Sequence, residues 1–276
     1  MTTDFTAAGS LHDLMLRADG LVTQAAALLA EMQHAPRSVT RKERRDVVTD
    51  ADLAAERLLI DGLSALTPEA GILSEEAGEA QAGSALRWII DPLDGTVNYA
   101  SGLPMFSATV ALQRQGRTIM GLTHAPRAGL VARYCWGEAA VIAEVNGAPA
   151  RTALTRELAD AVVSVSLTSS YGEADIGRAT EIIRRLAERT RGVRVVVSGA
   201  LEMSLVAAGQ LDAFVALRAD VVSHAAAMPL VRAAGGKVTT FAGQDAVDED
   251  MQRIASAPFI HEELLSVIQP ALSGTL

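Results

Sequence analysis

Apolar residues recur every three or four positions over residues 10–33, a spacing that predicts an amphipathic helix. Ser10 precedes this pattern, and a serine there can cap the N-terminus of the helix. A second helical pattern follows Thr49, another residue that can cap a helix, and it stops before Pro68. A third covers residues 173–190. Each of these helices is expected to turn one apolar face towards a core.

Residues 105–147 instead alternate apolar and polar side chains between glycines, which predicts antiparallel strands. Asn146-Gly147 adds a turn signal near the end of this region. Shorter segments predict strands at 71–76, 88–90, 161–167, 193–197 and 211–217, a helix at 200–208 and a Gly/Ala loop at 77–85. We expect the chain to divide near residue 150, into halves over 1–150 and 151–276.

The composition is that of a soluble globular protein, with 276 residues, 49% hydrophobic and 21% charged. The net charge of −9 argues against a broad nucleic-acid-binding surface. Cys135 is the only cysteine, so no intrachain disulfide can form, which favours a reducing compartment. The N-terminus does not resemble a secretory signal, and no apolar run is long enough to span a membrane. These features predict a cytoplasmic protein without nucleic-acid or membrane partners.

A pair of acids follows the apolar run at residues 88–90, which predicts a buried strand. Asp91 and Asp94 stand at its end, and Pro92 between them biases Asp91 away from helix. Gly95 permits a tight turn, after which a short helix can begin. Carboxylates bind hard cations, and the free N–H groups of a helix N-terminus suit an anion. A cation beside an anion site is what phosphate chemistry needs.

The string Asp91-Pro-Leu-Asp-Gly-Thr-Val-Asn-Tyr, followed by Gly102-Leu-Pro, resembles the signature of the inositol monophosphatase family of Mg²⁺-dependent phosphatases. This resemblance implies an α/β fold of the layered α+β type, the α–β–α–β–α sandwich of inositol monophosphatases and fructose-1,6-bisphosphatases. It implies an antiparallel sheet in the first half and a smaller mixed sheet in the second. The site would lie between the halves, and many relatives are homodimers.

The same resemblance assigns ligands for a first Mg²⁺, with Mn²⁺ as a possible substitute. They are the Glu75 and Asp91 carboxylates and the Leu93 carbonyl. Asp94 is implied as a ligand of a second Mg²⁺. The amides of Gly95 and Thr96 would bind the phosphate of the substrate. Without the resemblance, Glu75 would read as part of an exposed acidic turn.

The water-activating residues are implied by a second segment, Asp46-Val-Val-Thr-Asp-Ala-Asp, which resembles the family's Asp-x-Val-Thr-x-x-Asp. From it we expect Asp50 to act on the attacking water together with Thr96. The alternative is local, because Thr49, Asp50 and Asp52 all suit the start of a helix.

Two further segments can face the substrate. The stretch from Ser198 to Glu202 resembles a family segment that lines the substrate pocket, although packing is the better explanation for most of its residues, Glu202 included. The basic connection at 35–46 is either a solvated loop or a lid that carries Lys42, Arg44 or Arg45 towards a phosphate.

The chain departs from the family where a second signature, Trp-Asp, would stand. Counting back from Gly235-Gly236, this pair falls on Val222-Ser223, so Ser223 replaces a metal-ligating Asp. Serine is neutral, and the second cation site therefore loses one charge of attraction. Asp220 and His224 are possible substitute ligands, although His224 can equally lack any ligand role. Ala216 likewise stands where relatives often have a substrate-binding Glu.

Two functions remain open at this point. The first is a Mg²⁺-dependent phosphomonoesterase with a weakened or rebuilt second metal site, acting on a small phosphorylated metabolite such as a polyol, sugar or amino-alcohol phosphate. The second is a catalytically impaired family member that binds a phosphorylated ligand or a protein partner. A site in which the acids only hold a structural cation is a third, weaker interpretation.

Overall fold

The computed structural model describes residues 10–34, 39–41, 47–137 and 140–273. Its helices are α1 (Leu11–Met32), α2 (Asp50–Leu66), α3 (Thr96–Ala100), α4 (Glu173–Ala187), α5 (Gly199–Ala207), α6 (Val221–His224), α7 (Ala227–Ala233) and α8 (His261–Ser273), with a 3₁₀ turn at Leu158–Asp160. Its strands in the first half are β1 (Val39–Arg41), β2 (Val47–Thr49), β3 (Gly71–Ser74), β4 (Gly78–Ala80), β5 (Leu86–Asp94), β6 (Ser107–Arg114), β7 (Arg117–Ala125), β8 (Leu130–Trp136), β9 (Val141–Val145) and β10 (Ala148–Pro149). The strands of the second half are β11 (Val162–Val165), β12 (Gly192–Arg194), β13 (Ala213–Ala216), β14 (Lys237–Thr239) and β15 (Arg253–Ser256).

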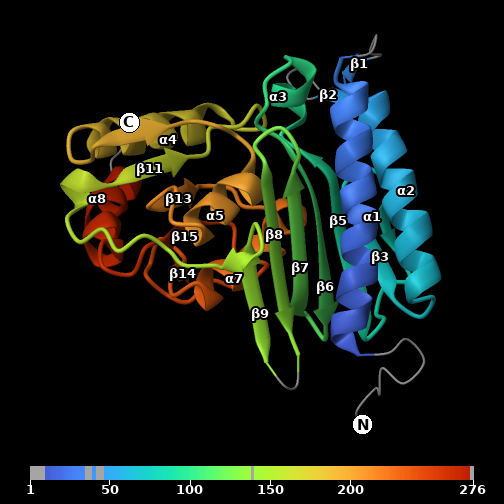
Figure 1. Ribbon diagram of the computed structural model, residues 1–276. Coiled ribbons are helices and arrows are strands. Elements are labelled where there is room, and N and C mark those ends of the chain that lie inside the picture. Colours follow the sequence, from blue (N-terminus) through green and yellow to red (C-terminus); the bar gives the residue numbers. More distant parts are fainter. Residues whose placement is uncertain (1–9, 35–38, 42–46, 138–139, 274–276) are drawn as a thin grey trace.

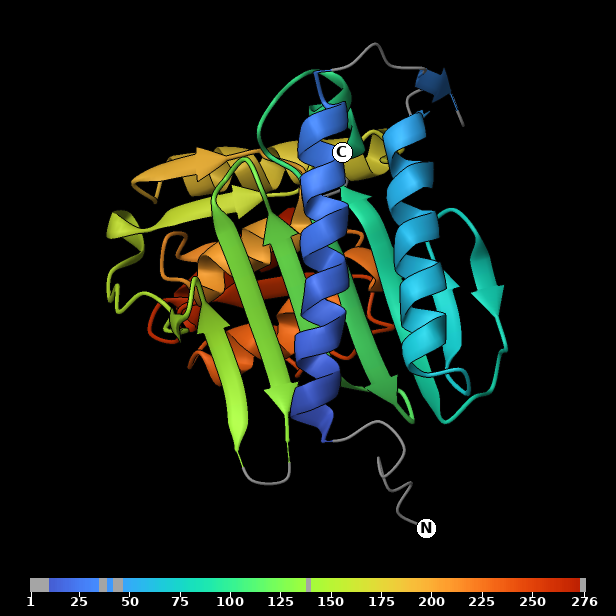
Figure 2. The same ribbon diagram turned by 45° about the vertical axis from the view of Figure 1, so that its right-hand side comes forward.

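These elements stack in the order helices, sheet, helices, sheet, helices (Figure 1). The α1 and α2 helices cover the outer face of the first sheet, as Figure 2 shows from the front. The α5 and α7 helices fill the space between the sheets, and α4 and α8 cover the far face of the second sheet. Each interface is a separate apolar core. The predicted α–β–α–β–α sandwich is therefore confirmed.

The first sheet, within the described residues, has eight strands in the order β10-β9-β8-β7-β6-β5-β3-β4. It is antiparallel except for one pair, β3 and β5, which run parallel. The predicted antiparallel sheet is thus a mixed one. The β4 strand replaces the predicted loop at 77–85, and it escaped prediction because its residues are all exposed and none is strongly apolar.

The second sheet has the order β12-β11-β13-β15-β14 in the described part of the chain. Its first three strands are parallel and its last two antiparallel, as expected for a mixed sheet. The first sheet ends at Pro149 and the second begins at Val162. The core between them takes residues from both halves, so a division into domains near residue 150 stays a prediction.

Side-chain caps fix the starts of the two outer helices. The Ser10 hydroxyl accepts a hydrogen bond from the Asp13 N–H at the start of α1, which confirms the predicted cap. Thr49 caps α2 in the same way with Asp52 as its partner. The β1 and β2 strands pair directly before α2. Lys42, Arg44 and Arg45, the proposed lid residues, lie outside the described residues.

One glycine allows β7 to approach the middle layer of helices. A Cβ on Gly121 would lie 2.2 Å from the Ala226 carbonyl oxygen. That distance is far inside van der Waals contact, so only glycine permits this approach. The contact fixes the junction between α6 and α7 against the first sheet.

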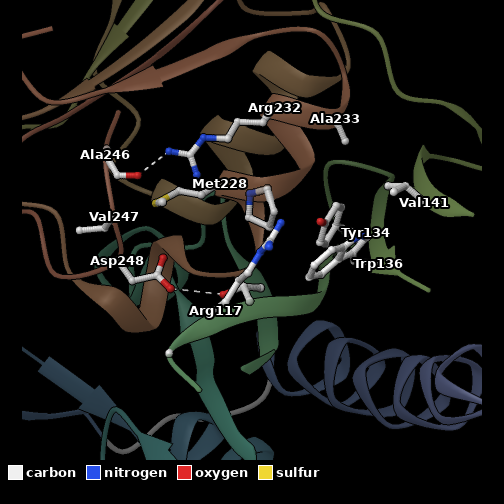
Figure 3. Close-up of a pocket in the computed structure, with 13 residues that line it drawn as sticks. Arg117, Tyr134, Trp136, Val141, Met228, Arg232, Ala233, Ala246, Val247 and Asp248 are labelled. Carbon is white, nitrogen blue, oxygen red and sulfur yellow. Dashed lines mark hydrogen bonds between the residues drawn. The ribbon is translucent and has the colours of Figure 1, made fainter. Parts of the chain in front are cut away.

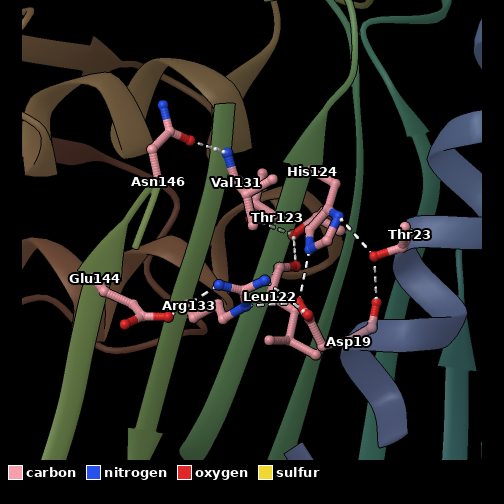
Figure 4. Close-up of polar contacts among 10 residues, drawn as sticks. Asp19, Thr23, Leu122, Thr123, His124, Val131, Arg133, Glu144 and Asn146 are labelled. Atoms are coloured by element: carbon pink, nitrogen blue, oxygen red, sulfur yellow. Dashed lines mark hydrogen bonds and ion pairs between the residues drawn. The ribbon is translucent and has the colours of Figure 1, made fainter. Parts of the chain in front are cut away.

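A polar cluster joins α1 to the sheet that it covers (Figure 4). Asp19 of α1 accepts hydrogen bonds from His124 Nε2 at 2.8 Å and from Arg133 Nε and Nη2 at 2.9 and 2.8 Å. Arg133 also pairs with Glu144 at 2.9 Å. Burial by itself would raise the pKa of Asp19, but the hydrogen bonds from His124 and Arg133 outweigh it and lower that pKa to about 2.

We predict that Asp19→Asn lowers the free energy of unfolding by about 2 kcal/mol, the usual effect of losing hydrogen bonds to a charged group. The pKa of Asp19 is below its ordinary 3.8, so its stabilisation is full above that pH and is lost as the pH falls towards 2. Urea unfolding at neutral and acidic pH measures both effects. Asp160→Asn is the matched control, because the ion pair of Asp160 with Arg191 is exposed and should contribute less than about 0.5 kcal/mol. An Asp19→Asn variant as stable as the control would contradict the assignment.

Candidate active site

The β5 strand carries the two predicted acids at its end. Its pairing with β6 is irregular between Asp91 and Asp94, where Pro92 lacks the N–H that a regular ladder needs. Both carboxylates are buried. The Leu93 N–H donates to Asp91 Oδ1 at 3.2 Å, which fixes the orientation of this side chain.

The parallel pairing of β3 with β5 brings Glu75 beside Asp91. Ser74 stands opposite Ile90 in register, and the Glu75 N–H donates to the Ile90 carbonyl at 3.2 Å. A carboxylate of α2 holds the turn that follows. Glu56 accepts hydrogen bonds from the Ser74 hydroxyl and from the backbone N–H groups of Glu76 and Ala77, the latter two at 3.1 and 2.9 Å. The predicted position of Glu75 thus depends on Glu56, which the sequence did not single out.

Asp94 is bound by the start of α5, across the junction of the two halves. It accepts hydrogen bonds from the Ser198 hydroxyl at 2.6 Å, the Gly199 N–H at 3.0 Å and the Ala200 N–H at 3.1 Å. Burial raises the pKa of Asp94 to about 6, although these hydrogen bonds oppose the shift. Each carboxylate oxygen has two lone pairs, so Asp94 keeps acceptor capacity for a further partner.

Ser198 and Glu202, predicted to face the substrate, are both fully buried. Glu202 accepts hydrogen bonds from the Ser198 N–H at 2.9 Å and from the Ser164 hydroxyl. Burial raises the pKa of Glu202 to about 7. In this structure the two residues hold the start of α5 and, through it, Asp94.

Thr96 contacts Asp52 and not Asp50. Its hydroxyl lies 3.0 Å from the Leu93 carbonyl oxygen and 3.3 Å from Asp52 Oδ1. Asp50 is exposed on the first turn of α2, and no hydrogen bond between described residues joins it to Thr96. Burial raises the pKa of Asp52, an effect that the Thr49 hydrogen bonds oppose. Counting could have found this residue, because the Asp-x-Val-Thr-x-x-Asp pattern that begins at Asp46 ends on Asp52.

Gly95 makes the turn into α3 with φ +90°, a conformation that favours glycine. A Cβ at this position would lie 2.8 Å from the Met105 carbonyl oxygen. The α3 helix then begins at Thr96, and the first N–H groups of a helix have no acceptor within it. The predicted phosphate-binding amides are therefore at a helix start beside Asp91 and Asp94.

The second half places Asp220 and Ser223 at this site. The Ser223 hydroxyl lies 2.9 Å from Asp91 Oδ2 and 3.2 Å from Asp220 Oδ2. Asp220 also caps α6 by accepting from the Ser223 N–H at 2.7 Å. Ser223 thus joins Asp91 of the first half to Asp220 of the second.

His224, the other possible substitute ligand, contacts Arg253 and Phe214. Its Nδ1 is 3.0 Å from Arg253 Nη1, and its ring packs edge-on against Phe214. Arginine only donates, so Nδ1 is an acceptor and the ring is neutral. Burial, with the Arg253 charge, lowers the pKa of His224 to about 4. Arg253 itself is fully buried in β15 beside Ala216, and nothing in the sequence marked it.

The electrostatics of the site favour a cation. Burial raises the pKa of Asp91 well above its usual range, and the charges of Glu75, Asp94 and Asp220 add to this shift. Among the residues that the structure describes, no group of three or more His, Cys, Asp or Glu side chains could hold a metal ion as it stands. The chemistry of the donors nevertheless fits Mg²⁺ or Mn²⁺, since carboxylate and carbonyl oxygens are the ligands that hard cations take.

These features define an α/β sandwich with an acidic site at strand ends, between two halves and next to a helix start. The sequence profile of the inositol monophosphatase family matches residues 12–273. The chain belongs to this family, which is a family of phosphatases.

Named relatives agree with this assignment. A "Fructose-1,6-bisphosphatase/inositol-1-monophosphatase" of Thermotoga maritima is 35% identical over 81% of this chain and 83% of its own. "Inositol-1-monophosphatase ImpA" of Mycolicibacterium smegmatis is 31% identical over 86% and 85%. "Nus factor SuhB" of Escherichia coli is 29% identical over 96% and 99%.

Solved structures share the fold. An IMPase of Thermotoga maritima superposes with a TM-score of 0.83 at 30% identity, covering 92% of this chain and 96% of its own. The extragenic suppressor protein suhB of Bartonella henselae gives a TM-score of 0.85 at 28% identity, covering 94% and 98%. No helix in the described part of the chain is both long and apolar enough to cross a membrane.

Proposed function

We propose that the protein is a metal-dependent phosphomonoesterase that uses water to hydrolyse a small phosphorylated metabolite. The observation that carries this proposal is the grouping of buried Asp91 with Glu75, Asp94 and Asp220, next to the Thr96–Asp52 pair. A site that only binds a ligand has no need of a carboxylate and a hydroxyl poised to act on water. Relatives named as inositol and fructose phosphatases support the same class of reaction.

The metal-binding residues in this proposal form two sites. Asp91, Glu75 and the Leu93 carbonyl would hold a first Mg²⁺ or Mn²⁺. Asp94 and Asp220 would hold a second, with the Ser223 hydroxyl between Asp220 and Asp91. When bound, the cations supply positive charge that makes a water molecule more acidic and offsets the charge of the phosphate.

The remaining residues orient the substrate and move a proton. The Gly95 and Thr96 amides at the start of α3 bind phosphate oxygens. The Thr96 hydroxyl and the Asp52 carboxylate orient a water molecule, and Asp52 takes its proton as the oxygen attacks phosphorus. The bond from phosphorus to the ester oxygen breaks, and the departing alkoxide takes a proton from solvent water to become the alcohol. Inorganic phosphate leaves as well, and Asp52 returns its proton to solvent. We therefore assign to Asp52 the role that the sequence pattern suggested for Asp50.

The substrate is proposed as a class only, a phosphomonoester of a polyol, sugar or amino alcohol. Ala216 is buried in β13 and offers no carboxylate to substrate hydroxyls, so inositol phosphate is not favoured over the others. A cytoplasmic location, a homodimeric state and the absence of nucleic-acid partners stay predictions, based on the single cysteine, the family and the net charge of −9.

A screen of phosphorylated metabolites with Mg²⁺ or Mn²⁺ tests the proposal. We expect at least one to release phosphate well above the rate of Asp91→Asn, which removes the central carboxylate charge. Rates equal to those of this variant for every substrate and both metals would favour the alternative function. In that case the protein is a family member that binds a phosphorylated ligand or a protein partner without hydrolysis.

Single substitutions of the two acids test which of them, Asp52 or Asp50, acts as the general base. We predict that Asp52→Asn lowers kcat by about a hundredfold or more, since it removes a general base. Asp50→Asn should change kcat by less than about threefold, because an exposed cap-region acid contributes only to α2. Thermal melts of both variants show whether lost helix capping, which costs about 1 kcal/mol, explains the result. The reverse order of the two kcat values would return the role to Asp50.

Substitutions that remove or add one carboxylate test the second metal site. We predict that Asp220→Asn raises the Mg²⁺ concentration for half-maximal activity by about tenfold, because affinity follows the number of charged ligands. Ser223→Asp should lower it, since a carboxylate then stands where the Ser223 hydroxyl contacts Asp91. Asp250→Asn, outside this cluster, serves as the control. If neither variant differs from this control, Asp220 and Ser223 take no part in cation binding.

A further inference from the structure

A second pocket lies at the opposite end of the first sheet from the acidic site. Asp94 pairs with Ser107 at the start of β6, whereas the other end of β6 pairs with Arg117 of β7. The eight residues of β6 span about 25 Å. The pocket has a volume of about 660 Å³, within the range of small-molecule sites. It is therefore separate from the residues proposed for hydrolysis.

The walls of this pocket come from both halves of the protein (Figure 3). The rings of Tyr134 and Trp136 form one side, from β8. Met228 and Pro229 of α7 form an apolar wall, and Arg232 lies one turn further along that helix. Val247 and Asp248 close another side. The lining is thus mostly apolar, with a few polar groups among it.

Two arginines line the pocket, and neither forms a close ion pair with a described residue, although Asp245 and Asp248 lie near enough for their charges to act on Arg232. Arg117 stacks 3.7 Å over the Trp136 ring and forms no ion pair with any described residue. Arg232 donates through Nη2 to the carbonyl oxygens of Val238, at 3.2 Å, and Ala246. It makes no ion pair within the described chain either. Stacking on Trp136 holds the Arg117 fork in place and leaves its N–H groups free to donate.

The Tyr134 hydroxyl is a further polar group of this pocket. Tyr134 is only 7% exposed, yet its hydroxyl makes no hydrogen bond to a described residue, and Figure 3 shows the oxygen turned into the pocket. Asp248, the acid in the lining, is partly occupied, through its Oδ2 atom. It accepts hydrogen bonds from the Gln113 side chain and from the Thr118 hydroxyl, the latter at 3.3 Å. The lining therefore offers the Arg117 guanidinium, the remaining N–H groups of Arg232 and the Tyr134 hydroxyl as donors, with two positive charges against the single carboxylate of Asp248.

We infer that this pocket binds a small organic anion with a flat apolar body. Its carboxylate, sulfonate or phosphate would accept hydrogen bonds from Arg117, Arg232 and the Tyr134 hydroxyl, because a guanidinium fork matches such groups. Its apolar body would pack against Trp136 and the Met228–Pro229 wall. This inference does not depend on the proposed hydrolysis.

Naphthalene sulfonate is a suitable probe, and the fluorescence of Trp136 and calorimetry report its binding. We expect saturable binding that weakens about tenfold or more in Arg117→Met, the effect of losing one charge-assisted pair. Tyr134→Phe should also weaken it. The neutral analogue naphthalene methanol should bind more weakly than the sulfonate.

Arg156→Met is the matched control, because Arg156 also stacks on an aromatic ring, that of Phe259 at 4.3 Å, but lies outside the pocket. It should bind the probe like the unaltered protein, and so should Asp91→Asn. Circular dichroism confirms that each variant is folded. Equal loss in Arg117→Met and Arg156→Met, equal affinity for the neutral analogue, or no saturation below about 10 mM would each overturn the inference.

Discussion

The hydrogen bonds of Asp94 hold the two halves of the protein together at the site. One carboxylate at the end of β5 accepts from Ser107 of the first sheet and from Ser198, Gly199 and Ala200 at the start of α5. The positive end of the α5 dipole favours the negative charge of Asp94. Because α5 also packs against the second sheet, this contact fixes where the second half stands relative to the strand that carries Asp91. Ser198 and Glu202 are fully buried and hold the start of α5 in place for this contact. This structural role explains their burial better than a role in substrate binding does.

Asp91 accepts fewer hydrogen bonds than Asp94 among the described residues, one from the Leu93 N–H and one from the Ser223 hydroxyl. The parallel register of β3 and β5 places Glu75 beside it, the β5 irregularity places Asp94 close by, and α6 adds Asp220. Packing forces these acids together, since each position is set by a strand or helix whose other residues lie in an apolar core. A cation is the partner that relieves such repulsion, so the packing energy of the fold supports metal binding.

Most of the fold could be predicted from the sequence because its signals are local. Apolar spacing, Ser10 and Thr49 mark the two outer helices, and alternation marks strands β6 to β9. The resemblance to the family singled out Asp91, Asp94 and Glu75, whose carboxylates lie near enough for their charges to interact. Helix-start preference could not distinguish Asp50 from Asp52, since both acids suit the first turn of α2. The Asp-x-Val-Thr-x-x-Asp spacing that begins at Asp46 does mark Asp52, and the contact of its carboxylate with the Thr96 hydroxyl of α3 agrees with that count. Arg253, the second pocket and the Ser223–Asp91 contact join segments more than a hundred residues apart or in different layers, and no local pattern encodes such pairs.

The charge at the α6 edge of the site follows from Ser223 and Asp220 together. A carboxylate in place of the Ser223 hydroxyl, 2.9 Å from Asp91, would add repulsion to an already crowded set of acids. The Ser223 hydroxyl instead donates a hydrogen bond to Asp91, and Asp220 supplies the carboxylate at this edge of the site. Asp220 also caps α6, so its Oδ1 is occupied by the Ser223 N–H while Oδ2 lies 3.2 Å from the Ser223 hydroxyl. A cation drawn to Asp220 therefore competes with the hydrogen bond from the Ser223 hydroxyl, which a carboxylate at position 223 could not donate, and with the backbone N–H bond that caps α6. The site is for this reason expected to hold its second cation more weakly than its first.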